Sequence, residues 1–107
     1  MAIIRMTDIE GRINKRGILS KLLVNQEHLS IHNLVVKASQ TIPPHAMPVA
    51  VTFFVVSGTG VIRVGGEDNH VQPGDIVQCP IETKMSVSAS ADEDLSILNL
   101  KTPSLKT

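Results

Sequence analysis

Short runs of β-branched and other apolar residues, separated by clusters of turn residues, fill the chain from Ile18 onward. The runs recur about every ten residues, a spacing typical of β-sandwiches and β-barrels. They cover residues 18–24, 29–38, 49–56, 60–64, 70–72, 76–79, 84–90 and 95–100. Clusters rich in Pro, Gly, Asn and Asp lie between them, for example at 43–44, 57–60, 65–69 and 73–75. No segment in this region keeps a 3.6-residue apolar period, so the pattern predicts an all-β fold.

The N-terminal segment is less regular than the rest. Apolar residues at 3, 4, 6 and 9 fit either an edge strand or an irregular arm, and residues 7–10 carry the Thr and Glu spacing of a helix start. A chain of 107 residues has room for one core. We therefore expect a single domain over residues 1–107, with an arm at 1–17, a barrel at 18–101 and a short frayed tail at 102–107.

The charge balance and the aromatic content exclude several classes of partner. Lys plus Arg and Asp plus Glu number 10 each, so no net positive charge attracts nucleic acid or an anionic membrane. Phe53 and Phe54 are the only aromatic residues, too few for a base-stacking surface, and no apolar run approaches the ~20 residues of a membrane span. Cys79 is the single cysteine and no secretory leader is visible, so we expect a cytoplasmic protein without disulfides.

Two of the expected strands show which side chains face the core. In residues 84–90, Met85, Val87 and Ala89 alternate with polar residues, so these three face inward. Residues 52–56 are apolar on both faces, because Phe53 and Phe54 point to opposite sides. The N-terminal arm or a second subunit must cover the outer face. We expect a symmetric homodimer with Phe54 and Val56 at or near the contact.

Residues 29–100 carry a set of motifs in a defined order. Pro43-Pro44-His45 precedes a strand, Phe53-Phe54-Val55-Val56-Ser57-Gly58-Thr59-Gly60 ends one, and Pro73-Gly74-Asp75 and Pro80 follow. In residues and in spacing this segment resembles the conserved barrel of the cupin family. The resemblance implies a double-stranded β-helix, also called a jelly-roll barrel, and a metal site with four ligand positions in the barrel mouth.

The four positions that the resemblance assigns to metal ligands are mostly altered. His45 matches the family pattern, whereas Met47 replaces a second His, Val51 a Glu and Met85 a third His. Even spacing puts positions 45, 47 and 51 on one strand face, and Met85 faces inward by its own alternation. These side chains should converge in the mouth, and the resemblance therefore implies a degenerate metal site on an intact barrel.

We predict that the mouth binds a small, partly apolar organic molecule, with no cofactor. The expected pocket residues are His45, Met47, Val51, Phe53, Met85 and Val87. His45 is the candidate catalytic residue, since imidazole serves as a general acid or base near neutral pH. It could equally be a remnant that only forms a local hydrogen bond. Whether His32 reaches the same pocket stays open, because the apolar period of its strand slips between faces.

Two other classes of function remain open. One is an enzyme, either a copper-dependent oxidase or dioxygenase that holds Cu(I) through His45, Met47 and Met85, or a metal-free isomerase with His45 as base. The alternative for the two methionines is simple packing of irregular apolar space. The other class is a structural or regulatory module in which the barrel serves only for dimerisation.

Overall fold

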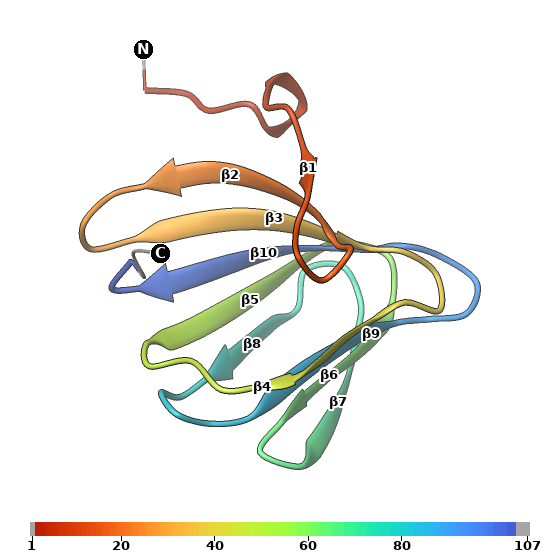
Figure 1. Ribbon diagram of the computed structural model, residues 1–107. Helices are drawn as coiled ribbons and strands as arrows, with labels where there is room; N and C mark the ends of the chain where they lie inside the picture. The colour runs from red at the N-terminus through yellow and green to blue at the C-terminus, as the bar shows by residue number, and fades with distance from the viewer. Residues whose placement is uncertain (1, 105–107) are drawn as a thin grey trace.

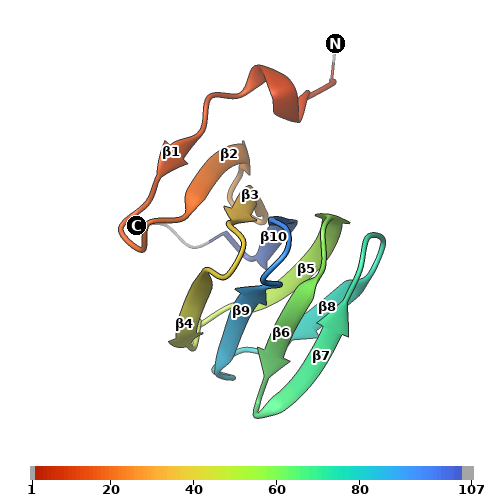
Figure 2. The same ribbon diagram turned by 90° about the vertical axis from the view of Figure 1, so that its right-hand side faces the viewer.

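Two antiparallel β-sheets face each other in the computed structural model of the chain, which describes residues 2–104 (Figures 1 and 2). The elements are a 3₁₀ turn η1 (Met6–Asp8) and strands β1 (Arg12–Ile13), β2 (Leu19–Asn25), β3 (Ser30–Val36), β4 (Thr41–His45), β5 (Ala50–Ser57), β6 (Gly60–Val64), β7 (Glu67–Val71), β8 (Ile76–Cys79), β9 (Met85–Ala89) and β10 (Leu95–Thr102). The large sheet has the order β1-β2-β3-β10-β5-β8 and the small sheet β4-β9-β6-β7. The predicted all-β jelly roll is confirmed.

Aliphatic side chains from both sheets form the core between them. Phe53 and Val55 from β5 meet Val87 from β9 and Ile97 from β10, all at most 2% exposed. Burying each such side chain contributes about 1.5–3 kcal/mol to folding. The alternation predicted along β9 is confirmed, since Met85, Val87 and Ala89 are buried while the serines between them are less so.

Strand β4 differs from the sequence prediction, which treated Pro43-Pro44 as a turn. β4 pairs with β9 alone and forms the edge of the small sheet. Proline lacks the N–H that a central strand must donate, but an edge strand tolerates it. The ladder is irregular between Ile42 and His45, where the two prolines lie. The pairing with β9 resumes at His45, the last residue of β4, which stands opposite Met85.

The hairpin between β6 and β7 is tighter than predicted. We expected a turn over residues 65–69, whereas only Gly65 and Gly66 connect the strands and β7 begins at Glu67. Both glycines have positive φ, 57° and 86°, as a two-residue type I′ turn requires. The acidic and amide residues that looked like loop therefore pair with β6.

The N-terminal arm lies beside β2, away from the small sheet (Figures 1 and 2). A short 3₁₀ turn, η1, is present near Thr7, but it begins at Met6 with Arg5 as its N-cap and has no side-chain cap, so the capping signal of residues 7–10 is not used. Ile4 and Met6 line a hollow on the large sheet together with Val56 and Leu98, so the arm partly covers the outer face. Of the expected tail, Thr102 belongs to β10 and residues 105–107 lie outside the described part. Within residues 2–104, no helix is long and apolar enough to cross a membrane.

Candidate functional site

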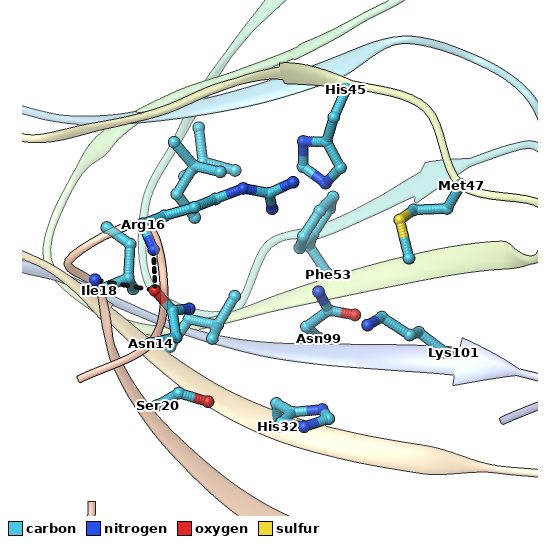
Figure 3. A pocket seen from close by; sticks show the side chains of 13 residues that line it. Asn14, Arg16, Ile18, Ser20, His32, His45, Met47, Phe53, Asn99 and Lys101 are labelled. Carbon is cyan, nitrogen blue, oxygen red and sulfur yellow. Dashed lines mark hydrogen bonds between the residues drawn. The ribbon is translucent and has the colours of Figure 1, made fainter. Parts of the chain in front are cut away.

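A cavity of about 270 Å³ opens between the two sheets (Figure 3). The small sheet contributes residues from β4 and β9, and the large sheet from β2, β3, β5 and β10. The loop between β1 and β2 and the loop between β4 and β5 complete the rim. The apolar lining of the cavity consists of Ile18, Leu34, Ile42, Met47, Phe53 and Val87. Most of these side chains belong to the barrel core, so the floor of the cavity is rigid and apolar.

The loop between β1 and β2 is held in place by its own hydrogen bonds. Asn14 Oδ1 accepts hydrogen bonds from the backbone N–H groups of Arg16, at 2.9 Å, and of Ile18, at 3.0 Å. Gln40 Nε2, in the turn between β3 and β4, donates to the carbonyl oxygen of Gly17 at 2.9 Å. These contacts fix the loop at the mouth, and the Arg16 side chain extends from it toward the ring of His45 (Figure 3).

His45 lies at the end of β4 with one ring nitrogen occupied. Its Nδ1 is 3.0 Å from the carbonyl oxygen of Pro43. Because a carbonyl oxygen only accepts hydrogen bonds, Nδ1 must carry the proton and Nε2 is the free nitrogen. Burial and the positive charges of Arg16 and Lys101 lower the pKa of His45, although the Pro43 hydrogen bond raises it in part. Near neutral pH the ring is therefore mainly neutral, with the lone pair on Nε2.

Lys101 and His32 bring further basic groups to the cavity from β10 and β3. Burial lowers the pKa of the Lys101 ammonium, and the charge of Arg16 lowers it further. Burial also lowers the pKa of His32, with a smaller contribution from Lys101. The question that the sequence left open is thus answered, because His32 and His45 line the same cavity.

Asn99 stands opposite His32 in the ladder between β10 and β3 and also lines the cavity. Its Oδ1 atom and the Nδ1 atom of His32 are buried and have no hydrogen-bond partner among the described residues. Buried polar atoms in native proteins nearly always have a partner, and leaving one without costs about 1–3 kcal/mol. These two atoms without partners therefore lie buried in the wall between β3 and β10, beside the cavity.

The structure brings four of the six predicted pocket residues to the cavity. His45, Met47, Phe53 and Val87 line it. Val51 and Met85 are 1% and 2% exposed and lie in the core rather than among the lining residues.

The sequence reasoning missed the polar half of the lining. These residues are Asn14, Arg16, Ser20, Asn99 and Lys101. We expected an apolar, methionine-lined mouth, whereas basic and amide side chains form its rim. One signal for them was available, because Asn99 and Lys101 follow Ile97 at even spacing and so share its inward face.

The residues at the four implied ligand positions do not fit a divalent metal ion. They supply one imidazole, two thioethers and the aliphatic side chain of Val51. Zinc, manganese or iron needs three or four nitrogen, oxygen or thiolate donors. In the described part of the chain, no three His, Cys, Asp or Glu side chains are grouped so that they could hold a metal ion.

Comparison with known proteins gives a family match and many structural matches. A family model described as Cupin domain matches residues 33–101. No curated protein matches the chain. Among solved structures, KdgF from a Halomonas species has a TM-score of 0.90 at 19% sequence identity, covering 99% of this chain and 96% of that chain.

Two further solved structures show how widely this fold is used. The polyketide cyclase RemF from Streptomyces resistomycificus has a TM-score of 0.85 at 15% identity, covering 95% of this chain and 79% of that one. A predicted oxalate decarboxylase from Thermotoga maritima has a TM-score of 0.83 at 17% identity, with 94% and 98% covered. Identities this low show a shared fold and nothing about the reaction.

Proposed function

Because the chain belongs to the cupin family, we propose that its barrel binds a small, partly apolar organic molecule and holds no divalent metal tightly. The observation that carries this proposal is the cavity with its apolar floor and polar rim. Ligand sites in proteins combine a mostly apolar lining with a few placed polar groups. A volume of about 270 Å³ is near the lower end for such sites, which favours a small ligand.

The tautomer and the protonation of His45 favour one chemical role beyond binding, which is proton transfer without a metal. The hydrogen bond to Pro43 fixes the tautomer, and the lowered pKa keeps the ring neutral near pH 7. A neutral imidazole with a free Nε2 is the form that accepts a proton from a bound molecule. His45 is thus the candidate general base of a metal-free isomerase.

A fragment screen by NMR tests the binding proposal. Uniformly ¹⁵N-labelled protein is mixed with small organic molecules, and backbone shifts are mapped onto the structure. We expect the largest shifts around the cavity, at residues such as Ser20, His32 and Asn99. Met47→Trp fills the mouth and should abolish these shifts, whereas Phe54→Trp, on the outer face of β5, should not. Hits that map elsewhere, or that survive Met47→Trp in a folded variant, contradict the proposal.

Elemental analysis of the purified protein tests the metal part of the proposal. We expect no stoichiometric zinc, manganese or iron, because the donor set does not suit these ions. One equivalent of copper would instead favour the copper-dependent enzyme, with His45, Met47 and Met85 as ligands. One equivalent of zinc or manganese would show that a donor set outside the four implied positions binds metal.

We also propose that two copies of the chain pair through the outer face of the large sheet. Phe54 is 36% exposed there, beside the hollow that the arm leaves over Val56 and Leu98. Exposed apolar surface of this kind is a common site of self-association. Sedimentation should give the mass of two chains, and Phe54→Lys should reduce it to one. Ile81→Lys, at another exposed apolar position, is the control that should leave the mass unchanged. A one-chain mass for the parent protein contradicts the pairing.

A further inference from the structure

We propose that the molecule bound in the cavity is a carboxylate, whose anionic group contacts Arg16 and Lys101 while its apolar part lies against the floor. This inference rests on the proposed function, because it assigns a chemical class to the ligand of that site. It follows from the charges at the rim, from the positions of the two cations and from the apolar floor below them.

The lining of the cavity contains basic groups and no acidic group. Arg16, Lys101, His32 and His45 contribute to it, and neither Asp nor Glu does. In the described part of the chain, the ion pairs are Lys37 with Asp94 and Arg63 with Asp68, so neither Arg16 nor Lys101 has an acidic partner there.

This arrangement costs free energy when the cavity holds no anion. Lys101 is partly buried, and two positive charges near each other repel more strongly where water is partly excluded. Burial is the main cause of the lowered pKa of Lys101, and the positive charge of Arg16 lowers it further. A bound anion would remove this repulsion, so a negatively charged ligand stabilises the site in a way that a neutral one does not.

The two cations reach the same space from different parts of the chain. Arg16 extends from the loop between β1 and β2, and Lys101 from β10, and both point toward the region between His45 and Asn99 (Figure 3). A guanidinium group binds a planar carboxylate through two parallel hydrogen bonds, and an ammonium adds a point charge. The apolar floor below, with Phe53 and Val87, favours a carboxylate that carries a hydrophobic group.

A carboxylate fits this rim better than a phosphate does. Phosphate sites usually include a row of backbone N–H groups at a helix N-terminus or a glycine-rich loop. The cavity is lined by strands and by two short loops. In the loop between β1 and β2 the Arg16 and Ile18 N–H groups already donate to Asn14, and the loop between β4 and β5 contributes the apolar side chain of Met47. The rim thus offers two cationic side chains and no phosphate cradle.

The test compares ligands of equal shape and different charge. 4-Fluorobenzoate and 4-fluorobenzamide are titrated into the protein, with ¹⁹F and ¹⁵N NMR to measure affinity and to locate the site. We expect the benzoate to bind at least about tenfold more tightly than the benzamide, because the carboxylate accepts charge-assisted hydrogen bonds from both cations and the neutral amide does not. Phenylphosphonate is the third ligand, and we expect it to bind more weakly than benzoate.

Variants of the two cations assign the preference to specific side chains. Arg16→Gln and Lys101→Met should each reduce the affinity for benzoate several-fold and leave the affinity for benzamide unchanged. Lys15→Gln removes a charge from the neighbouring position, which does not line the cavity, and should have little effect on either ligand. Thermal melts confirm that each variant is folded, and the comparison of ligands on the parent protein decides the question without any variant.

The outcomes separate the inference from the function on which it rests. Equal binding of benzoate and benzamide at the cavity overturns the carboxylate assignment and keeps the proposed function. Tighter binding of phenylphosphonate also overturns it, in favour of a phosphate-like ligand. If Lys15→Gln weakens benzoate binding as much as Arg16→Gln does, the preference comes from the general positive charge of the loop and not from a contact between Arg16 and the carboxylate, which contradicts the inference. If none of the ligands shifts residues of the cavity at millimolar concentration, the proposed function fails for molecules of this size, and the inference fails with it.

Discussion

The floor and the rim of the cavity come from different parts of the chain. Most of the floor, including Phe53 and Val87, lies within residues 33–101, the segment that matches the family model. Four of the seven polar lining residues lie before that segment, at Asn14, Arg16, Ser20 and His32. The family-matched segment therefore supplies most of the apolar floor together with Lys101, whereas the loop between β1 and β2 adds Arg16, which lies outside the family match. We expect stability to depend mainly on the floor and ligand choice mainly on the two cations of the rim.

The strongest test of this division is the removal of a floor side chain. Phe53→Ala should lower the free energy of unfolding by about 3–5 kcal/mol, because Phe53 is 2% exposed and its loss leaves a cavity in the core. Phe54→Ala, at the next position on the outer face, should cost about 1 kcal/mol. Urea unfolding curves of the two variants measure the difference. Equal losses would show that the two faces of β5 contribute alike and would contradict the packing described for the core.

A second test concerns the close contact between the turn after β5 and the start of β10. Gly58 has φ of 83°, and a Cβ atom there would meet the backbone carbonyl group of Asp94. Gly58→Ala should therefore cost about 3 kcal/mol or more. Gly66 has a similar φ of 86° but open space around it, so Gly66→Ala isolates the conformational cost, about 1 kcal/mol. Similar unfolding midpoints for the two variants would mean that β5 and β10 are not held as closely as the structure indicates.

The rim should respond differently from the barrel. Asn14→Ala removes the acceptor of two backbone hydrogen bonds in the loop that carries Arg16. We expect a loss of stability of about 1 kcal/mol, together with a several-fold weaker affinity for benzoate. Chemical unfolding and the ¹⁹F titration give the two numbers for the same sample. A variant that binds benzoate as the parent does would show that Arg16 needs no fixed loop.

The smallest expected effect is a pH dependence centred on the two histidines. The pKa values of His32 and His45 are lowered in the folded chain from the ordinary value of 6.5. Below about pH 6.5 the unfolded chain therefore binds more protons than the native one, so stability falls as the pH is lowered through this window and is retained above it. The shift on Asp94 concerns a carboxyl group and acts at lower pH.

The affinity for an anion should depend on pH in the opposite direction to the stability. A carboxylate near Arg16, Lys101, His32 and His45 favours the protonated imidazoles, so benzoate should bind more tightly at about pH 5.5 than at about pH 7.5. Melting curves and titrations at both values measure the two trends. His32→Gln and His45→Gln should each flatten them. Affinity that falls on acidification, while benzoate remains ionised, would contradict the basic rim.

The sequence predicted the barrel well because its signals are local. Alternation along β9 and glycine or proline turns every few residues identify strands without knowledge of their partners. The interpretation failed at β4, where Pro43-Pro44 is read as a turn unless the strand is known to lie at an edge. Edge position depends on the order of strands in the sheet, which the local pattern does not contain.

The candidate site was only half predictable for a similar reason. His45 and Phe53 were found because the family motif and the strand period mark them. Arg16 was not found, because its position depends on contacts between distant segments, such as the hydrogen bond from Gln40 to Gly17. Lys101 was within reach of parity reasoning from Ile97, but a lysine near the end of a strand is more often exposed than turned inward.

The way in which the loop between β1 and β2 is attached has a consequence for how such a protein can change its specificity. Residues 14–17 make hydrogen bonds among themselves and one through Gln40, and Arg16 contributes nothing to the core. Replacing Arg16 by an acidic or a neutral residue would thus reverse or remove a charge at the mouth while the barrel keeps its stability. Selection can therefore change which ligand the site prefers by a single substitution at position 16, while the folding stability of the domain stays the same.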